Sequence, residues 1–329
     1  MNLYTRVELP TDLPKLTHAH RLLLLGSCFA AGMGERLAEA KFRCDVNPYG
    51  ILYNPHSISA ALREIVAGRS YDLPDLFFFQ ERWHSPMHHG DFSSPDAEET
   101  LQRINERISQ AYKQMFQTDY LLLTFGTAWV YEQKETGRLV ANCHKLPEKE
   151  FTRRRLSADE IVKDYTSLLS ELLTHNPQLK VMFTVSPIRH VRDGLHANQL
   201  SKATLLLAIE GLQTAFPESV FYFPAYELIL DELRDYRFYA EDMVHPSAVA
   251  VDYIWERFSS VCFAEETLQI IEESENIRRA LAHKPFHPES EEYKRFLGQI
   301  VLKIERLNGK YPYLDFQKER ELCHIRLKA

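Results

Sequence analysis

Apolar runs alternate with amphipathic stretches along most of the chain. Short apolar runs, each followed closely by glycine, serine, asparagine or proline, predict buried strands at 21–25, 42–46, 120–125, 180–185 and 220–223. The intervening segments show helical spacing of their apolar residues, at 30–41, 57–67, 98–116, 157–175, 199–216 and 247–258. Strands that alternate with helices of ten or more residues indicate βαβ units, so we expect an α/β fold with a mostly parallel sheet.

Two segments interrupt this alternation, and one follows it. Residues 71–95 are aromatic and rich in histidine, which indicates an insertion loop, and residues 129–150 suggest a hairpin-like excursion turning at 135–137. Beyond residue 264 the chain is charged, helical in pattern and broken by prolines. We therefore expect two units, an α/β domain over 1–263 and a C-terminal helical extension over 264–329.

Composition narrows the class of protein. The formal net charge is −7, and Arg153-Arg154-Arg155, the densest basic run, is interpreted as a solvated turn, so we expect no nucleic-acid partner. The five cysteines are odd in number and lack a C-x-x-C pair, which favours reduced thiols in the cytoplasm. No secretory signal is visible, and the apolar runs are far shorter than the ~20 residues of a membrane helix, so we expect no membrane association.

Three residues that follow predicted strands have the chemistry of a catalytic triad. In parallel sheets, ligands bind beyond the carboxyl ends of the strands, where Ser27 and the pair Asp242 and His245 are expected. A serine hydroxyl needs a base, and that base needs a carboxylate to hold one tautomer. Each element alone is commonly a turn or a helix cap, but their combination at strand ends favours a Ser-His-Asp site.

The string Gly26-Ser27-Cys28-Phe29-Ala30 resembles the signature of the GSCFA family, a branch that resembles the SGNH/GDSL hydrolases. The resemblance extends over roughly 22–258 through further strings, namely 47–50 with 54–55, 124–129, 142–145, 186–190, 222–224 and 231–237. It implies a three-layer α/β/α sandwich with a flavodoxin-like sheet. It also implies Ser27 as nucleophile, Asp242 and His245 as its partners, and an oxyanion hole that includes the N–H groups of Ser27 and Gly50.

The chain departs from the superfamily pattern at the third oxyanion donor. The pattern expects Gly-x-Asn, but Gly126-Thr127-Ala128 has alanine in the asparagine position. Because one such donor stabilises the transition state by about 2.7–4 kcal/mol, we expect another group to replace the asparagine. The Asn142 amide is preferred over the Thr127 hydroxyl because an amide N–H₂ is a dedicated donor.

Other polar residues are candidates for contact with a substrate. Arg189 has the planar fork that binds carboxylates or phosphates, although an ion pair with Asp193 or Glu232 is an equal alternative. The remaining candidates for substrate binding are His190, Tyr49 and Asn54.

Two competing chemistries are less favoured. Cys28 is a second nucleophile candidate, but neighbouring residues project differently and a small packed side chain is the commoner fate. The cluster of His84, His88, His89 and Asp91 contains metal-ligating groups. Its spacing favours a lid or surface histidines, so we predict neither a metal nor a cofactor.

The leading functional hypothesis is a serine hydrolase that removes an O-acyl group, most plausibly acetyl, from a carbohydrate or similar small polar ester. An acyltransferase would use the same site. The alternative is a non-catalytic binding module in which the missing asparagine marks lost catalysis, and a metal-dependent hydrolase ranks third. For the C-terminal helices we weigh covering the sheet edge, capping the active site, and forming a homo-oligomer interface.

Overall fold

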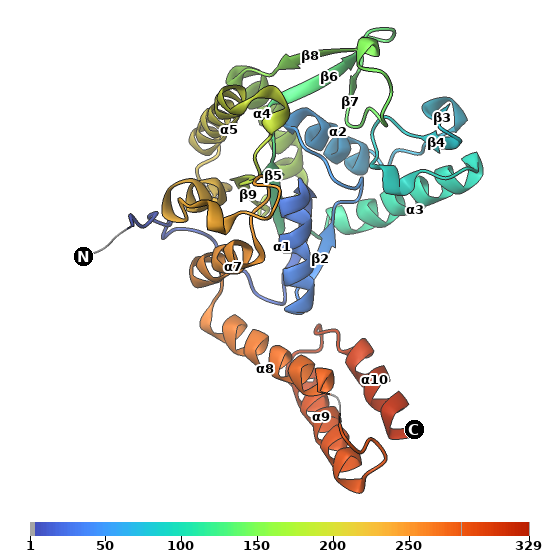
Figure 1. Ribbon diagram of the computed structural model, residues 1–329, viewed down its shortest axis with the longest axis vertical. Coiled ribbons are helices and arrows are strands. Elements are labelled where there is room, and N and C mark those ends of the chain that lie inside the picture. The colour runs from blue at the N-terminus through green and yellow to red at the C-terminus, as the bar shows by residue number, and fades with distance from the viewer. Residues whose placement is uncertain (1–3, 284, 329) are drawn as a thin grey trace.

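The computed structural model describes residues 4–283 and 285–328, and a five-stranded parallel sheet lies at the centre of this part of the chain (Figure 1). Its strands are β1 (Arg21–Gly26), β2 (Arg43–Val46), β5 (Tyr120–Phe125), β9 (Lys180–Val185) and β10 (Val220–Tyr222). They lie in the order β10-β9-β5-β1-β2, and every pairing is parallel. This is the 2-1-3-4-5 strand order of flavodoxin-like sheets.

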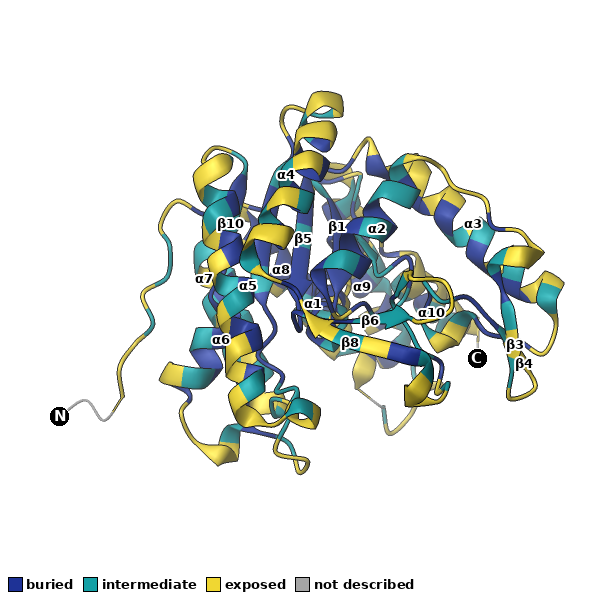
Figure 2. Cartoon of the chain, turned by 90° about the horizontal axis from the view of Figure 1, so that it is seen from above, coloured by how far each residue is buried: buried dark blue, intermediate teal, exposed yellow. Residues whose placement is uncertain are grey.

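The strands separate two hydrophobic cores because successive side chains point to opposite faces. Along β1, Leu23 and Leu25 belong to one core, whereas Leu22 and Leu24 belong to the other. The first core is closed by α2 (Pro55–Val66), α3 (Ala97–Met115), α4 (Ala158–His175) and α5 (Leu195–Ala215). The second is closed by α1 (Cys28–Glu39), α6 (Ala225–Glu227) and α7 (Ala248–Cys262). Buried strands between two helical layers confirm the expected α/β/α sandwich (Figure 2).

Two small antiparallel sheets lie outside the central one. The predicted insertion loop contains a hairpin of β3 (Phe77–Phe79) and β4 (Arg82–His84), and the excursion forms β6 (Trp129–Gln133), β7 (Leu139–Val140) and β8 (Phe151–Arg155). The solvated turn expected at 153–155 is therefore wrong, because these arginines belong to β8 and pair with β6. Arg153 is held there by the faces of Trp129 and Tyr131.

The C-terminal helices pack around a core of their own. They are α8 (Glu265–Ala282), α9 (Glu291–Lys310) and α10 (Gln317–Lys328), which bury residues such as Leu297, Ile304 and Phe316. This lobe projects away from the sheet (Figure 1). Its contacts with the α/β part include an ion pair of 2.6 Å between Lys41 and Glu319.

Within residues 4–283 and 285–328, no helix combines the length and the apolarity that crossing a lipid bilayer requires.

Candidate active site

Ser27 stands at the junction between β1 and α1. Its predecessor Gly26 has φ +152°, and a Cβ there would lie 2.4 Å from the Thr124 carbonyl oxygen, so the tight exit from β1 requires glycine. Ser27 is the N-cap of α1, and its Oγ accepts a hydrogen bond of 3.3 Å from the Phe29 N–H. The serine hydroxyl is thus fixed beside a helix N-terminus, where negative charge is stabilised.

Asp242 and His245 form a hydrogen-bonded pair on the loop before α7. Asp242 Oδ2 lies 2.6 Å from His245 Nδ1, while Oδ1 accepts from the backbone N–H groups of Val244 and His245 at 2.9 Å each. These bonds, above all the one from the His245 backbone N–H, lower the pKa of Asp242 to about 2. An ionised carboxylate on Nδ1 leaves the imidazole Nε2 free to act as an acceptor.

Gly126, at the end of β5, links the serine to the loop beyond β9. A Cβ on Gly126 would lie 3.6 Å from Ser27 Cβ and 3.3 Å from His190 Nε2, so both side chains border the same small space. The neighbouring Arg189 N–H donates to the Val244 carbonyl at 3.2 Å, which ties this loop to the one carrying Asp242 and His245. Consistent with this, the charge of His245 contributes to lowering the pKa of His190.

Ser27, His190 and the Asp242–His245 pair therefore gather at the carboxyl edge of the sheet. Within the described residues, no hydrogen bond joins the Ser27 hydroxyl to His245. Catalytic hydrogen bonds commonly form only when substrate is bound, so this geometry is compatible with a nucleophile and its base.

Two of the three predicted oxyanion donors besides Ser27 are engaged in other hydrogen bonds, and the third stays a prediction. The Gly50 N–H donates to the Asn47 carbonyl at 2.7 Å within a turn, so the prediction that it serves as an oxyanion donor is wrong. The Thr127 hydroxyl lies 3.1 Å from the Ser201 hydroxyl and accepts from a backbone N–H, so it too is engaged inside the fold. Asn142 lies in the excursion, where its Oδ1 accepts from the His144 N–H at 2.9 Å, and its role stays a prediction.

Two of the proposed substrate contacts hold the fold instead. Tyr49 is fully buried, donates to Glu64 at 2.8 Å and stacks on His88. Asn54 is 5% exposed and caps α2 by accepting from the Ser57 N–H at 2.8 Å. Neither side chain is available to a substrate, so these two assignments are wrong.

Arg189 packs against two tyrosine rings, and its contact with a substrate stays a prediction. Its guanidinium lies over the rings of Tyr239 and Tyr236, at 4.0 and 5.1 Å. The ion-pair alternatives are wrong, because Asp193 pairs with Arg153 at 2.6 Å and Glu232 lies 3.6 Å from Arg257. The tyrosines and the start of α5 border a small cleft of about 150 Å³ beside this guanidinium.

Lys202 is a member of the site that the sequence did not reveal. It lies on α5, is 1% exposed, and donates 2.7 Å hydrogen bonds to the carbonyls of Gly126 and Ser186. Burial lowers its pKa to about 7. One lysine thus connects the ends of β5 and β9, but a single cation in a helical segment gives no local signal of this role.

The expectation of surface histidines is wrong for two members of the histidine-rich segment, His84 and His88, whereas His89 pairs at 2.9 Å with the exposed Asp91. His84 and His88 are buried, and their ring nitrogens contact the hydroxyls of Ser93 and Ser85 at 2.7 and 2.9 Å. In the described part of the chain, no group of three histidine, cysteine, aspartate or glutamate side chains is arranged to hold a metal ion. The cysteine next to the nucleophile, Cys28, places its Sγ 3.9 Å from the Tyr53 hydroxyl.

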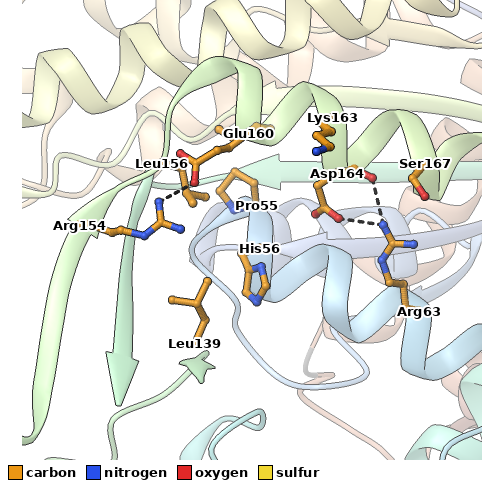
Figure 3. Close-up of a pocket in the computed structure, with 11 residues that line it drawn as sticks. Pro55, His56, Arg63, Leu139, Arg154, Leu156, Glu160, Lys163, Asp164 and Ser167 are labelled. Carbon is orange, nitrogen blue, oxygen red and sulfur yellow. Dashed lines mark hydrogen bonds and ion pairs between the residues drawn. The ribbon is translucent and has the colours of Figure 1, made fainter. Parts of the chain in front are cut away.

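A cleft of about 490 Å³ lies elsewhere, between α2, α4 and the excursion (Figure 3). Its arginines are already paired, Arg63 with Asp164 at 2.8 Å and Arg154 with Glu160 at 2.7 Å. It contains none of the triad candidates, and its paired charges indicate a structural role.

Comparison with known proteins identifies the family. The model of the GSCFA family matches residues 21–258, and that of the "GSCFA domain protein, C-terminal domain" matches residues 274–329. The chain therefore belongs to the GSCFA family. No curated protein matches it. Among solved structures, a carbohydrate esterase family 3 protein from Talaromyces cellulolyticus is similar at 12% identity and a TM-score of 0.36, over 77% of this chain and 98% of that one.

Proposed function

We propose that this member of the GSCFA family is a serine hydrolase that cleaves an O-acyl ester, with Ser27 as nucleophile, His245 as base and Asp242 as the carboxylate that orients the base. The observation that supports the proposal best is the 2.6 Å contact between Asp242 and His245 Nδ1, on a loop tied to the one that meets Ser27 at Gly126. The order of nucleophile, carboxylate and base along the chain matches the resemblance stated from sequence.

The proposed reaction gives each of these groups one task. As Ser27 Oγ attacks the acyl carbonyl carbon, His245 Nε2 takes the hydroxyl proton, and the ionised Asp242 stabilises the imidazolium that forms. The Ser27 N–H, at the start of α1, donates to the developing oxyanion. The imidazolium then protonates the leaving alcohol, and water activated by the same base releases the acyl group.

The substrate that we propose is an acetyl ester of a carbohydrate or a similar small polar molecule. Arg189, whose guanidinium lies beside tyrosines and has no carboxylate partner within the described residues, would contact a polar or anionic part of that molecule. A second alcohol in place of water would turn the same site into an acyltransferase.

The test is turnover of an acetyl ester such as p-nitrophenyl acetate, together with labelling by a fluorophosphonate probe. Ser27→Ala should abolish both, because the bond-forming oxygen is gone. Cys28→Ala is the matched control, since it changes the adjacent residue and should retain both. Labelling that persists in Ser27→Ala would contradict the assignment. An unlabelled wild-type protein that binds glycans would support the binding-module alternative, which the alanine in the asparagine position of the Gly-x-Asn pattern favours.

A further inference from the structure

The Ser27 N–H is the one oxyanion donor of the superfamily pattern that the described residues leave free for the proposed reaction. The position where the superfamily has asparagine is Ala128, whose side chain is fully buried and cannot donate. Gly50 and Thr127 have their groups engaged within the fold. A serine hydrolase that had only the Ser27 N–H would forgo one or two donors, each worth about 10²–10³-fold in rate.

His190 has an unused hydrogen-bonding atom at this place. Its Nε2 is buried and has no partner among the described residues, which is costly unless a ligand completes it. The atom faces Gly126 on the side shared with Ser27 Cβ, and the Tyr53 ring stands edge-on to the imidazole with centroids 6.0 Å apart.

The surroundings fix His190 in position. Its backbone N–H donates to Asn198 Oδ1 at 2.9 Å, and Lys202 binds the carbonyls of Gly126 and Ser186, at the ends of the two neighbouring strands β5 and β9. The charged and titratable groups that act on the imidazole are Lys202, Asp193 and His245. Burial above all, and then the charge of Lys202, lower the pKa of His190 to about 4, so the ring is neutral near pH 7 and carries a single N–H.

We propose that His190 Nε2–H donates a hydrogen bond to the oxyanion formed when Ser27 attacks the ester carbonyl, in place of the missing asparagine. This inference rests on the proposed hydrolase function and adds a catalytic residue to it. The N–H bond is not broken in the step, and the proton of the serine hydroxyl still goes to His245. A neutral imidazole suits this role because it polarises the oxygen without protonating it.

The competing donor is Asn47 Nδ2, which is also buried and without a partner in the described chain. The Asn47 side chain already has a structural task, because its Oδ1 accepts from the Gly26 N–H at 2.9 Å at the exit of β1. The His190 ring has no comparable structural hydrogen bond at Nε2 among the described residues, and this atom borders Gly126 directly. The observations therefore favour the imidazole.

Two substitutions separate a donor from the other roles that a histidine can fill. His190→Leu removes the N–H donor but fills a similar space with an apolar side chain. His190→Gln places an amide N–H₂ near the position of Nε2, and this amide cannot act as a base at neutral pH. In His190→Leu we expect kcat for the acetyl ester to fall by about 10²–10³-fold with KM nearly unchanged. In His190→Gln we expect kcat to remain within about tenfold of wild type, a rescue that a base could not show.

Each other outcome is decisive. Wild-type turnover in His190→Leu would overturn the inference and assign the donor to another group, either Asn47 or Asn142. A loss in His190→Gln as large as in His190→Leu, with both variants folded by circular dichroism, would indicate a base or a packing role. Fluorophosphonate labelling of Ser27 in the wild-type protein reports the hydrolase function separately. If labelling occurs and both variants keep full activity, only the role of His190 fails; if wild-type Ser27 is never labelled, both proposals fall.

Discussion

Replacing Lys202 by methionine should change the free energy of unfolding in a pH-dependent way. The wild-type ammonium is buried in α5, and burial lowers its pKa from 10.5 to about 7. Between about pH 7 and pH 10 the unfolded chain therefore binds more protons than the folded one, and the stability of the wild-type protein rises with pH over this window. Methionine has no such group, so the variant lacks this rise.

The magnitude follows from the shift. Each pH unit within the window adds up to about 1.4 kcal/mol to the free energy of unfolding of the wild-type protein. Raising the pH from 7 to 9.5 should therefore increase the difference in this free energy between wild type and Lys202→Met by about 3 kcal/mol. A separate contribution does not depend on pH. The carbonyls of Gly126 and Ser186 each lose a donor in the variant, which costs about 1–3 kcal/mol per unsatisfied group. Relief from burying a charge offsets part of that loss near neutral pH.

Urea unfolding of both proteins at half-unit steps from pH 6.5 to 9.5 measures the difference directly. Lys180→Met is the matched control, because Lys180 also donates to a carbonyl, that of Glu218 at 2.8 Å, but from an exposed position. Subtracting the control variant removes the general effect of deleting a lysine charge. A stability difference between wild type and Lys202→Met that stays constant with pH would refute the assignment of a buried, partly neutral amine.

Three further outcomes are expected. Burial lowers the pKa of His88 to about 3 and of His144 to about 4, so both imidazoles are neutral in the folded protein and take up a proton on unfolding below about pH 6.5. The Tm should therefore drop as the pH falls from about 6.5 to 4, and it should drop less in His88→Gln. Gly126→Ala places a methyl 2.9 Å from the Tyr53 carbonyl oxygen and 3.3 Å from His190 Nε2, so the loop beside Ser27 must shift. Ester turnover should then fall by about 100-fold or more while circular dichroism still reports a folded protein, and unchanged turnover would mean that the site is assembled elsewhere. Thr127→Val should lower stability by about 1 kcal/mol and leave turnover within a few-fold, whereas a 100-fold fall would identify the threonine hydroxyl as a donor.

Most strands of the sheet could be predicted from the sequence, because each is a short apolar run that ends at a turn residue. The runs at 120–125 and 180–185 match β5 and β9 residue for residue, since each is buried and ends at a turn residue. The helix expected from residue 157 is likewise confirmed, because Ser157 and Glu160 form a capping box at the start of α4. The strand at 151–155 escaped notice because an exposed, arginine-rich edge strand depends on its pairing with β6, which no local pattern encodes.

The candidate site was only partly readable, for the same reason. The spacing of Asp242 and His245 predicts a local contact, and they do make one. The competing partners of Gly50, Thr127 and Tyr49 arise from the turn at Asn47, from α5 and from α2, so only the folded chain shows which groups are engaged. The burial of Lys202 likewise depends on contacts with residues distant in the sequence, namely Gly126 and Ser186.

The separate core of the C-terminal lobe has a consequence for how the protein tolerates change. Because α8, α9 and α10 bury their apolar faces mainly against one another, substitutions there are constrained chiefly by neighbours inside the lobe. Loops beyond β1, β5 and β9 are instead locked by backbone bonds such as those from the Gly126 and Thr127 N–H groups to the Tyr53 carbonyl. A substitution inside the lobe is therefore expected to change its own packing without displacing the loops that carry Ser27 and His245.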